Sequence, residues 1–410
     1  MNPLSNDQRV SIEPDVRLVL TSQAFRAFGY GFGSVLLAST LAERGLTSIS
    51  VGVVLGALVA GTVIAQLLIA RWADGWGRRR SYLTLYLALG LSGLVFASAV
   101  PLWVLVAAAL TGALSAEVVE SGPFTSLELS MLSGRLDTNA LAAGFGWYNA
   151  IAAAAGSLGA LSAAIPQLTR EVWSGAPADR VWFLLLVPIA AAGMIIARRL
   201  SPSVELMTGR GRAAPLGPSR RVVTLLAGLF GLDAFAGGFV VQTFIAFWLI
   251  DRHGASTAAV GAVFAAVGVV QTASFLAAPL IARRWGLLNT MVFTHLPSNL
   301  LLAAVAFAPN LEVAAGLLLA RAALSQMDIP TRQAYVMTLV GPEERTAAIA
   351  YTNTARYLVR PIGPLVAGFM FTVTGGLPFL IAGLLKSVYD LTLWSWFRTV
   401  PLPTKEETAP

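Results

Sequence analysis

The sequence predicts an all-α integral membrane protein in which twelve transmembrane helices form two pseudo-symmetric bundles of six. Of its 410 residues, 56% are hydrophobic and only 12% are charged, whereas soluble domains average about 25% charged residues. The apolar residues also fall into segments of about 20 residues, the length that crosses a bilayer as a helix. A polar stretch at 201–221 divides these segments into two sets of six.

The first bundle is predicted over 16–200, after a polar tail at 1–15. Its spans are 16–42, 48–71, 80–100, 102–125, 140–166 and 181–200. The second bundle is predicted over 222–398, after the linker 201–221 and before a tail at 399–410. Its spans are 222–250, 256–282, 287–308, 311–337, 346–372 and 376–397. Many spans are rich in Gly and Ala, which let helices pack closely in lipid.

The distribution of arginine predicts the orientation. The loops on the linker side carry most arginines, whereas each arginine of the opposite loops lies beside an acid. Cytoplasmic loops collect Arg and Lys, so we expect the linker and both termini in the cytoplasm and the chain in the plasma or inner membrane. The same rule explains the formal net charge of +7 without a nucleic-acid partner.

Several classes of function are disfavoured by what the sequence lacks. There is no cysteine and there are only two histidines, His253 and His295, in different segments. We therefore expect no metal site and no other cofactor. No nucleophile with an evident partner base is present, so we do not expect an enzyme.

The two halves carry matching residues in the same order, which indicates duplication of a six-helix unit. A shift of 207 residues matches Arg26 to Asp233, Phe28 to Phe235, Gly31 to Gly238 and Pro123 to Pro330. A shift of 204 matches Asn149 to Asn353 and Gly159 to Gly363.

The loop between the second and third spans, "ARWADGWGRRR" from Ala70 to Arg80, resembles the loop motif of the major facilitator superfamily. Asp74, Gly77, Arg78 and Arg79 match that motif, whereas the positions of Ala70, Trp72 and Gly75 differ from it. The resemblance implies the fold of that superfamily, alternating access and a monomer. It also implies that Asp74, with Arg78 as a partner, helps to latch the halves in the outward-facing state. Binding of the arginines to anionic lipid is the alternative.

Charges inside the spans are candidates for function, because a charge at the bilayer centre costs about 2.5–3.5 kcal/mol on insertion scales. The resemblance implies that the first, fourth, seventh and tenth spans line a central cavity. The candidate residues for substrate binding and coupling are Arg26, Tyr30, Glu120, Asn149, Asp233, Gln242, Asp328, Arg332, Asn353, Arg356 and Arg360. For single amides such as Asn149 and Asn353, a structural role in hydrogen bonds between helices is favoured over substrate binding.

Spacing predicts which charges pair. Asp328 with Arg332 and Lys386 with Asp390 are four residues apart and share a helix face, and the latter pair lies in a span that is peripheral in this family. Arg26 and Asp233 occupy matching positions, so we expect an ion pair between them across the cavity. Arg356 and Arg360 are like charges on one face, and therefore need acids or an anionic ligand.

We expect a secondary active transporter that moves a small organic solute, with proton-coupled efflux ranked first. Asp233 is the leading coupling carboxylate, because an acid that pairs with arginine in only one state can bind and release a proton. A permanent structural ion pair is the alternative role. Transport of an organic or inorganic anion held by the cavity arginines ranks second, and uniport and sodium coupling stay open.

Overall fold

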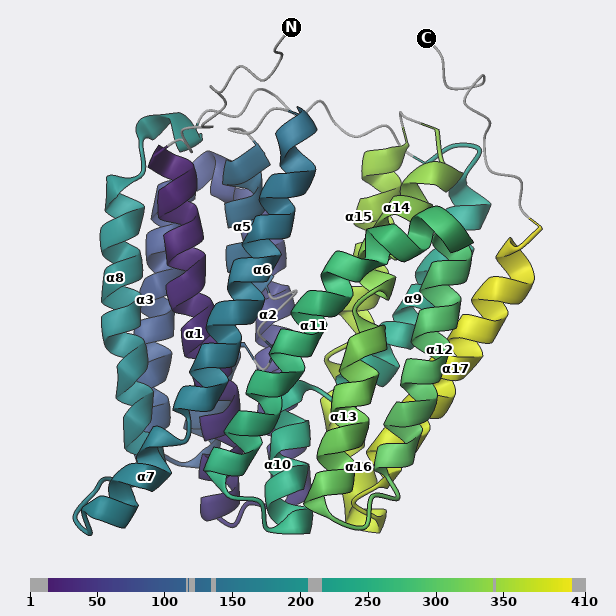
Figure 1. Cartoon of the computed structure of the whole chain (residues 1–410). Helices are drawn as coiled ribbons and strands as arrows, with labels where there is room; N and C mark the ends of the chain where they lie inside the picture. Colours follow the sequence, from purple (N-terminus) through teal and green to yellow (C-terminus); the bar gives the residue numbers. More distant parts are fainter. Residues whose placement is uncertain are drawn as a thin grey trace, which may run out of the picture.

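The structure, a computed structural model, describes residues 14–115, 117, 122–133, 138–205, 216–341 and 344–399, which contain helices and no strand (Figure 1). The first half contains α1 (Pro14–Glu43), α2 (Ser48–Trp76), α3 (Arg78–Ala97), α4 (Leu102–Ala109), α5 (Gly122–Ser133), α6 (Thr138–Ser162), α7 (Ile165–Val172) and α8 (Leu186–Arg199). Short 3₁₀ turns precede and follow α8, at Asp179–Leu185 and Pro202–Glu205.

The second half contains α9 (Arg220–Gly238), α10 (Gln242–His253), α11 (Thr257–Trp285), α12 (Leu287–Val305), α13 (Leu311–Ser325), α14 (Asp328–Leu339), α15 (Arg345–Val359), α16 (Ile362–Val373) and α17 (Leu377–Phe397). The two halves stand side by side, and both termini lie at the same end of the molecule (Figure 1). This order of helices follows the order of the predicted spans.

Eight segments of the described chain are long and apolar enough to cross a membrane. Predicted spans that are not continuous helices include 102–125, 311–337 and 346–372, which divide into α4/α5, α13/α14 and α15/α16. Span 222–250 is also interrupted, between α9 and α10. Irregular backbone at membrane depth is tolerated where it lines a cavity or is buried in protein, so these breaks indicate where the interior site lies.

The packing of α1 on α6 is repeated by α9 on the junction of α15 and α16. A Cβ atom on Gly31 would lie 2.0 Å from the carbonyl oxygen of Gly156, and one on Gly238 would lie 2.6 Å from that of Arg360. Gly31 matches Gly238 under the 207-residue shift, and Gly156 matches Arg360 under the 204-residue shift. The two halves therefore share one packing scheme, which gives the fold its pseudo-symmetry.

The halves touch each other at the end opposite the termini. There α2 crosses α16 so closely that a Cβ on Gly52 would lie 2.6 Å from the carbonyl oxygen of Pro364. Nearby, Gln242 of α10 donates a hydrogen bond to the hydroxyl of Ser34 in α1 (2.9 Å). Toward the termini, α5 and α6 diverge from α14 and α15 (Figure 1), so the far end is the closed end.

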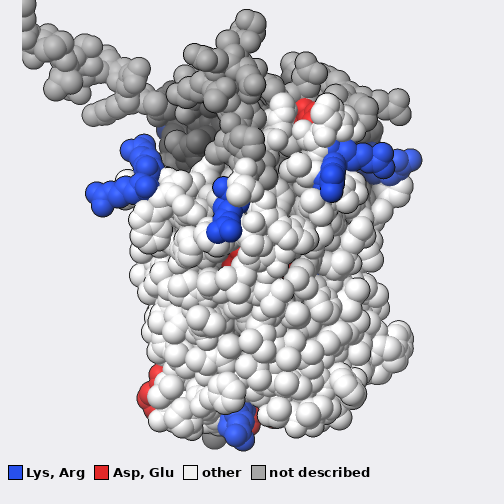
Figure 2. Space-filling model, turned by 90° about the vertical axis from the view of Figure 1, so that its right-hand side faces the viewer, with Lys and Arg blue, Asp and Glu red and all other residues white. Residues whose placement is uncertain are grey.

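The surface has the pattern of a protein in a bilayer. On the face viewed in Figure 2, a broad and nearly uncharged belt separates two charged ends, and lysine and arginine gather mainly at the end that carries the termini. Large apolar side chains that point out of the fold include Trp103, Leu276 and Phe369, which are 64–71% exposed. Exposure of this kind is favourable against lipid tails and unfavourable in water.

We expect Gly52→Ala to weaken the closed far end, because the added methyl group would overlap the backbone of α16. Since the chain has no cysteine, a single Ser34→Cys reporter can be followed by its reaction with a maleimide in purified protein. The reaction should be several-fold faster when Gly52→Ala is present.

Gly316→Ala in α13 is the matched control, because a Cβ there has no neighbour within 4 Å and alanine favours the helix. Equal maleimide rates in the Gly52→Ala and Gly316→Ala backgrounds would contradict the assignment of the closed end.

Candidate functional site

A central cavity of about 190 Å³ lies within the second half. Its lining comes from the described residues of α9–α17, except for Glu117, which the first half contributes from the break between α4 and α5. Charged and polar side chains make up much of this lining: Glu117, Asp233, Gln242, Gln271, His295, Arg321, Gln326, Asp328, Arg332, Arg356, Arg360 and Lys386. The apolar side chains of the lining include Val240, Ile245, Phe264, Val267 and Leu318.

A second cavity of about 340 Å³ lies between the halves, on the side of the termini. Both halves line it, through residues that include Gln66, Thr125 and Asn149 in the first half and Gln333, Asn353 and Tyr357 in the second. It shares Ala234, Ile329, Arg356 and Arg360 with the central cavity. The two cavities therefore adjoin, and together they lead from the center of the protein toward the end that carries the termini.

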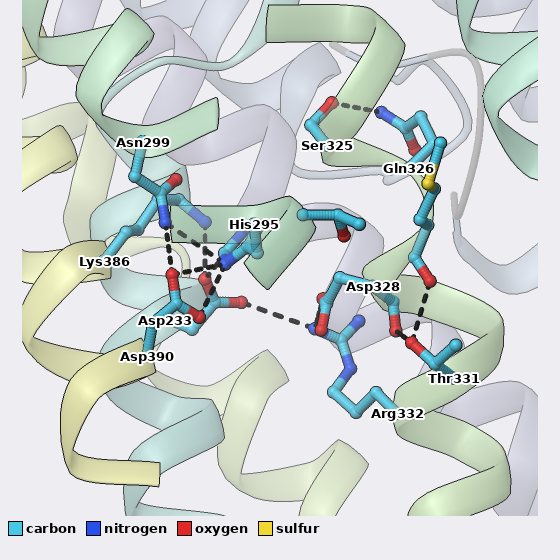
Figure 3. A network of polar contacts seen from close by, with 12 residues as sticks. Asp233, His295, Asn299, Ser325, Gln326, Asp328, Thr331, Arg332, Lys386 and Asp390 are labelled. Carbon is cyan, nitrogen blue, oxygen red and sulfur yellow. Dashed lines mark hydrogen bonds and ion pairs between the residues drawn. The ribbon is translucent and has the colours of Figure 1, made fainter. Parts of the chain in front are cut away.

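One wall of the central cavity is an ionic network around Asp233, here called the Asp233 cluster and made of Asp233, His295, Asp328, Arg332, Lys386 and Asp390 (Figure 3). The carboxylate of Asp233 lies 2.5 Å from Nζ of Lys386 and 3.5 Å from a guanidinium nitrogen of Arg332. Arg332 also donates to Asp328, one turn before it in α14, at 2.5 Å. All six side chains are no more than 8% exposed.

His295 of α12 connects two carboxylates of this cluster. Its Nδ1 lies 3.0 Å from Asp390, and its Nε2 lies 4.0 Å from Asp233 (Figure 3). Asn299, one turn later in α12, donates to the same carboxylate of Asp390 at 2.8 Å. With a neutral imidazole, the three acids of the cluster outnumber Lys386 and Arg332, and a proton on His295 would balance the charge.

A second wall consists of Arg321, Arg356 and Arg360, here called the arginine wall. Arg360 forms an ion pair with Glu117, which joins the end of α15 to the break between α4 and α5 in the other half. Arg321 is close enough to Glu117 to interact with its charge, and its Nε is buried with no hydrogen-bond partner among the described residues. Three guanidinium groups thus gather on this wall, within reach of the charges of Glu117 and Asp233.

Arg26 does not line either cavity. It is 1% exposed and donates to Glu128 of α5 at 2.5 Å, and also to Gln23 and to Tyr148. Tyr82 donates to the other oxygen of Glu128 at 2.5 Å. A buried charge needs a partner and further hydrogen bonds, and this network supplies both inside the first half.

The predicted ion pair between Arg26 and Asp233 is therefore wrong in this conformation. Each half instead pairs its own charge, Arg26 with Glu128 and Asp233 with Lys386 and Arg332. The predicted pair Lys386–Asp390 is wrong as well, because Lys386 turns to Asp233 and Asp390 turns to His295. The predicted pair Asp328–Arg332 is confirmed.

The other candidates from the sequence fall into three groups. Gln242, Arg356 and Arg360 line the central cavity, and Asn149 and Asn353 line the cavity between the halves. Tyr30 is buried away from both and donates to the backbone oxygen of Ala113 at 2.6 Å. Glu120 lies outside the described residues.

The loop motif holds the end of the first half. Gly77, with φ +103°, lets α2 turn directly into α3. The backbone N–H groups of Arg78 and Arg79 both donate to Glu205 (2.6 and 3.0 Å), and Arg79 also donates to the backbone oxygen of Arg198 (2.7 Å). The side chain of Asp74 lies outside the described residues, so its latch stays a prediction.

A comparable contact occurs at the terminal end of the second half. The carboxylate of Glu344, just before α15, accepts a hydrogen bond from the backbone N–H of Gly217. Hydrogen bonds from Ser219 and Gly217 lower the pKa of Glu344 below its ordinary value. The beginning of the second half is thereby attached to the loop between α14 and α15.

Sequence reasoning missed the roles of His295, Lys386, Asp390 and Glu128. His295 and Asn299 are four residues apart and so form one polar face on an otherwise apolar span, which is a usable signal. Lys386 and Asp390 form such a face on the last span. This signal was not used because the last span was expected to be peripheral. In the structure, α17 packs against α12 behind the cavity.

We expect Glu128→Gln to lower the unfolding free energy by about 3–5 kcal/mol, because it leaves the buried Arg26 without its carboxylate. The apparent thermal midpoint in detergent should fall by several degrees. A double variant, Arg26→Met with Glu128→Leu, should recover much of the loss, since it removes both charges. A midpoint for Glu128→Gln equal to that of the parent protein would contradict this account.

Comparisons with known proteins agree with the geometry. The model of the Major Facilitator Superfamily matches residues 19–363. An uncharacterized membrane protein of Saccharomyces cerevisiae, YJR124C, is 24% identical over 430 residues, which covers 96% of each chain.

Two solved structures are similar to the fold as a whole. A bacterial homolog of the human lysosomal transporter Spinster, in an inward-facing and occupied conformation, aligns with a TM-score of 0.71 at 14% identity over 97% of this chain and 98% of its own. The human organic anion transporter MFSD10 aligns with a TM-score of 0.61 at 17% identity over 93% of this chain and 99% of its own. The chain therefore belongs to the Major Facilitator Superfamily, and it is a membrane transporter of the secondary kind.

Proposed function

We propose that the chain transports a small organic anion by alternating access. The observation that carries the proposal is the arginine wall, which places the three guanidinium groups of Arg321, Arg356 and Arg360 in the lining of the central cavity. The buried Nε of Arg321 has no hydrogen-bond partner among the described residues. Guanidinium groups bind carboxylates and other oxyanions by paired hydrogen bonds. The apolar residues Phe264, Val267 and Leu318 suit the body of such a molecule.

The sequence alone ranked proton-linked export of a small organic compound above anion transport. The balance of charge in the cavity favours the reverse order, because the acids Asp233 and Asp328 are already occupied by Lys386 and Arg332. A cation would have to displace one of these partners. The similarity to a human organic anion transporter is consistent with this order, but at 17% sequence identity it shows only a shared fold.

The Asp233 cluster is proposed as the proton-coupling group, with Asp233 as the carboxylate that changes partners. Support comes from its position: it lines the same cavity as the arginine wall, and His295 lies between Asp233 and Asp390, where it can exchange a proton with either. Proton coupling and export both stay predictions until transport is measured.

The moving units, the orientation and the oligomeric state are also part of the proposal. Bundles at 16–200 and 222–398 would move against each other, with the linker 201–221 and both termini in the cytoplasm of a plasma or inner membrane. With that orientation, a far end that is closed and a cavity that leads toward the termini describe an inward-facing state. The transporter is proposed to work as a monomer.

We expect purified protein in proteoliposomes to exchange benzenesulfonate in a counterflow assay, and not benzyltrimethylammonium, which carries the same ring with a positive charge. Arg356→Gln, in the arginine wall, should reduce exchange at least about tenfold, the equivalent of losing one charged hydrogen-bonding partner. Arg283→Gln, exposed at the end of α11, is the matched control. Exchange of the cation alone would overturn the proposed class of substrate.

We expect vesicles with an acidic interior to concentrate benzenesulfonate as protons leave, with the membrane potential clamped. Asp233→Asn should remove this response to the pH gradient while counterflow exchange continues, because a neutral amide cannot carry the proton. Asp251→Asn, exposed at the end of α10, should behave like the parent protein. An unchanged pH response in Asp233→Asn would exclude Asp233 as the coupling group.

A further inference from the structure

Glu117 stands apart from the other charged residues of the central cavity because it is the described lining residue that comes from the first half. It lies in the irregular stretch between α4 and α5, where the fourth span is interrupted. Its carboxylate reaches across the interface and forms an ion pair with Arg360, at the junction of α15 and α16. This ion pair therefore connects the two bodies that alternating access must move.

The ion pair is accessible from the cavity. The side chain of Glu117 is 27% exposed and that of Arg360 is 18% exposed, whereas Arg26 and Glu128 in the first half are 1% and 0% exposed. An ion pair that is partly solvated is held less tightly than a fully buried network, because water and ligands can replace either partner. Arg360 and Glu117 can thus separate, while Arg26 and Glu128 form a fixed part of the scaffold.

The surroundings of Glu117 resemble those of a bound anion. Its charge is close to Arg321, whose buried Nε has no hydrogen-bond partner among the described residues. Arg356 lines the same part of the cavity as Arg360, and both also line the cavity that leads toward the termini. An anion that enters by this route meets the guanidinium group of Arg360, with which Glu117 forms its ion pair.

From these contacts we infer that Glu117 is an internal counter-ion that occupies the anion subsite on Arg360, and that an organic anion displaces it. Displacement breaks the ion pair between the halves and so releases the state that is closed at the far end. The inference rests on the proposed transport of an organic anion. It adds a residue that links binding to the change of conformation.

The mechanism follows from the competition for one guanidinium group. Without a ligand, Arg360 is satisfied by Glu117, so the positive charge of the wall is reduced and the halves stay linked. With a ligand, the sulfonate or carboxylate takes over Arg360, and Glu117 turns toward water in the adjoining cavity. Part of the free energy of binding then offsets the cost of breaking the link, and in this way a substrate shifts a conformational equilibrium.

The first test measures the affinity for benzenesulfonate by titration calorimetry in detergent. Glu117→Gln keeps the shape and removes the competing charge, so Kd should fall about tenfold, as expected when an occupied site becomes free. Glu117→Asp keeps a competing carboxylate and should bind about as weakly as the parent protein. Glu171→Gln, an exposed acid in α7, is the control and should leave Kd unchanged.

The second test needs no ligand and uses the Ser34→Cys reporter at the closed end. Glu117→Gln should speed its reaction with maleimide several-fold, because the link that favours the closed end is lost. Glu117→Asp keeps the carboxylate and should react as slowly as the parent protein. This result would show that the faster reaction of Glu117→Gln comes from the lost charge and not from misfolding. Addition of benzenesulfonate to the parent protein should speed the reaction as well.

The outcomes separate the inference from the proposed function. If the parent protein binds benzenesulfonate and Glu117→Gln binds it no more tightly, displacement is wrong while anion transport stands. If no variant binds the anion, the proposed substrate class fails, and the maleimide rates alone then decide about the link. Equal rates in Glu117→Gln and the parent protein would overturn the link in either case.

Discussion

The rest of the structure depends on one constraint: a charge at membrane depth must be compensated by a partner inside the protein. The first half meets it by enclosing Arg26 and Glu128 with tyrosine hydroxyls from α3 and α6. The second half meets it at the surface of a cavity, where Asp233 is shared between Lys386 and Arg332. One network is therefore enclosed in its half, whereas the other borders a cavity, where we propose that Asp233 changes partners.

This difference turns two copies of one packing scheme into a molecule with unequal halves. The close approaches of α1 to α6 and of α9 to the α15–α16 junction occur at the matched glycines Gly31 and Gly238, yet the charged residues that precede these glycines, Arg26 and Asp233, are opposite in sign. Among the described residues, Glu117 is the point where the first half enters the central cavity. Binding and proton exchange are therefore proposed mainly for the second half, with Glu117 as the proposed link between the halves.

The fold was predictable because hydropathy, the arginine distribution and the loop at Ala70–Arg80 depend on local sequence. The partners in the ionic networks were harder to predict from the sequence. Asp328 and Arg332 were found because they are one helical turn apart, whereas Arg26 with Glu128 are 102 residues apart and Asp233 with Lys386 are 153 apart. Such pairs depend on how helices rotate about their axes, which a duplicated pattern alone does not determine. The shift of 207 residues shows that Arg26 and Asp233 occupy equivalent positions in the two halves. Equivalent positions need not be in contact, and the predicted ion pair assumed that they were.

The central claim is that an organic anion binds to the arginine wall and replaces Glu117. A structure of the protein with benzenesulfonate, determined by electron microscopy in lipid nanodiscs, tests it most directly. The account predicts the sulfonate on Arg360 and its neighbours, with the Glu117 carboxylate more than about 4 Å from Arg360, beyond ion-pair range. A sulfonate bound elsewhere, with Glu117 still paired to Arg360, would contradict it.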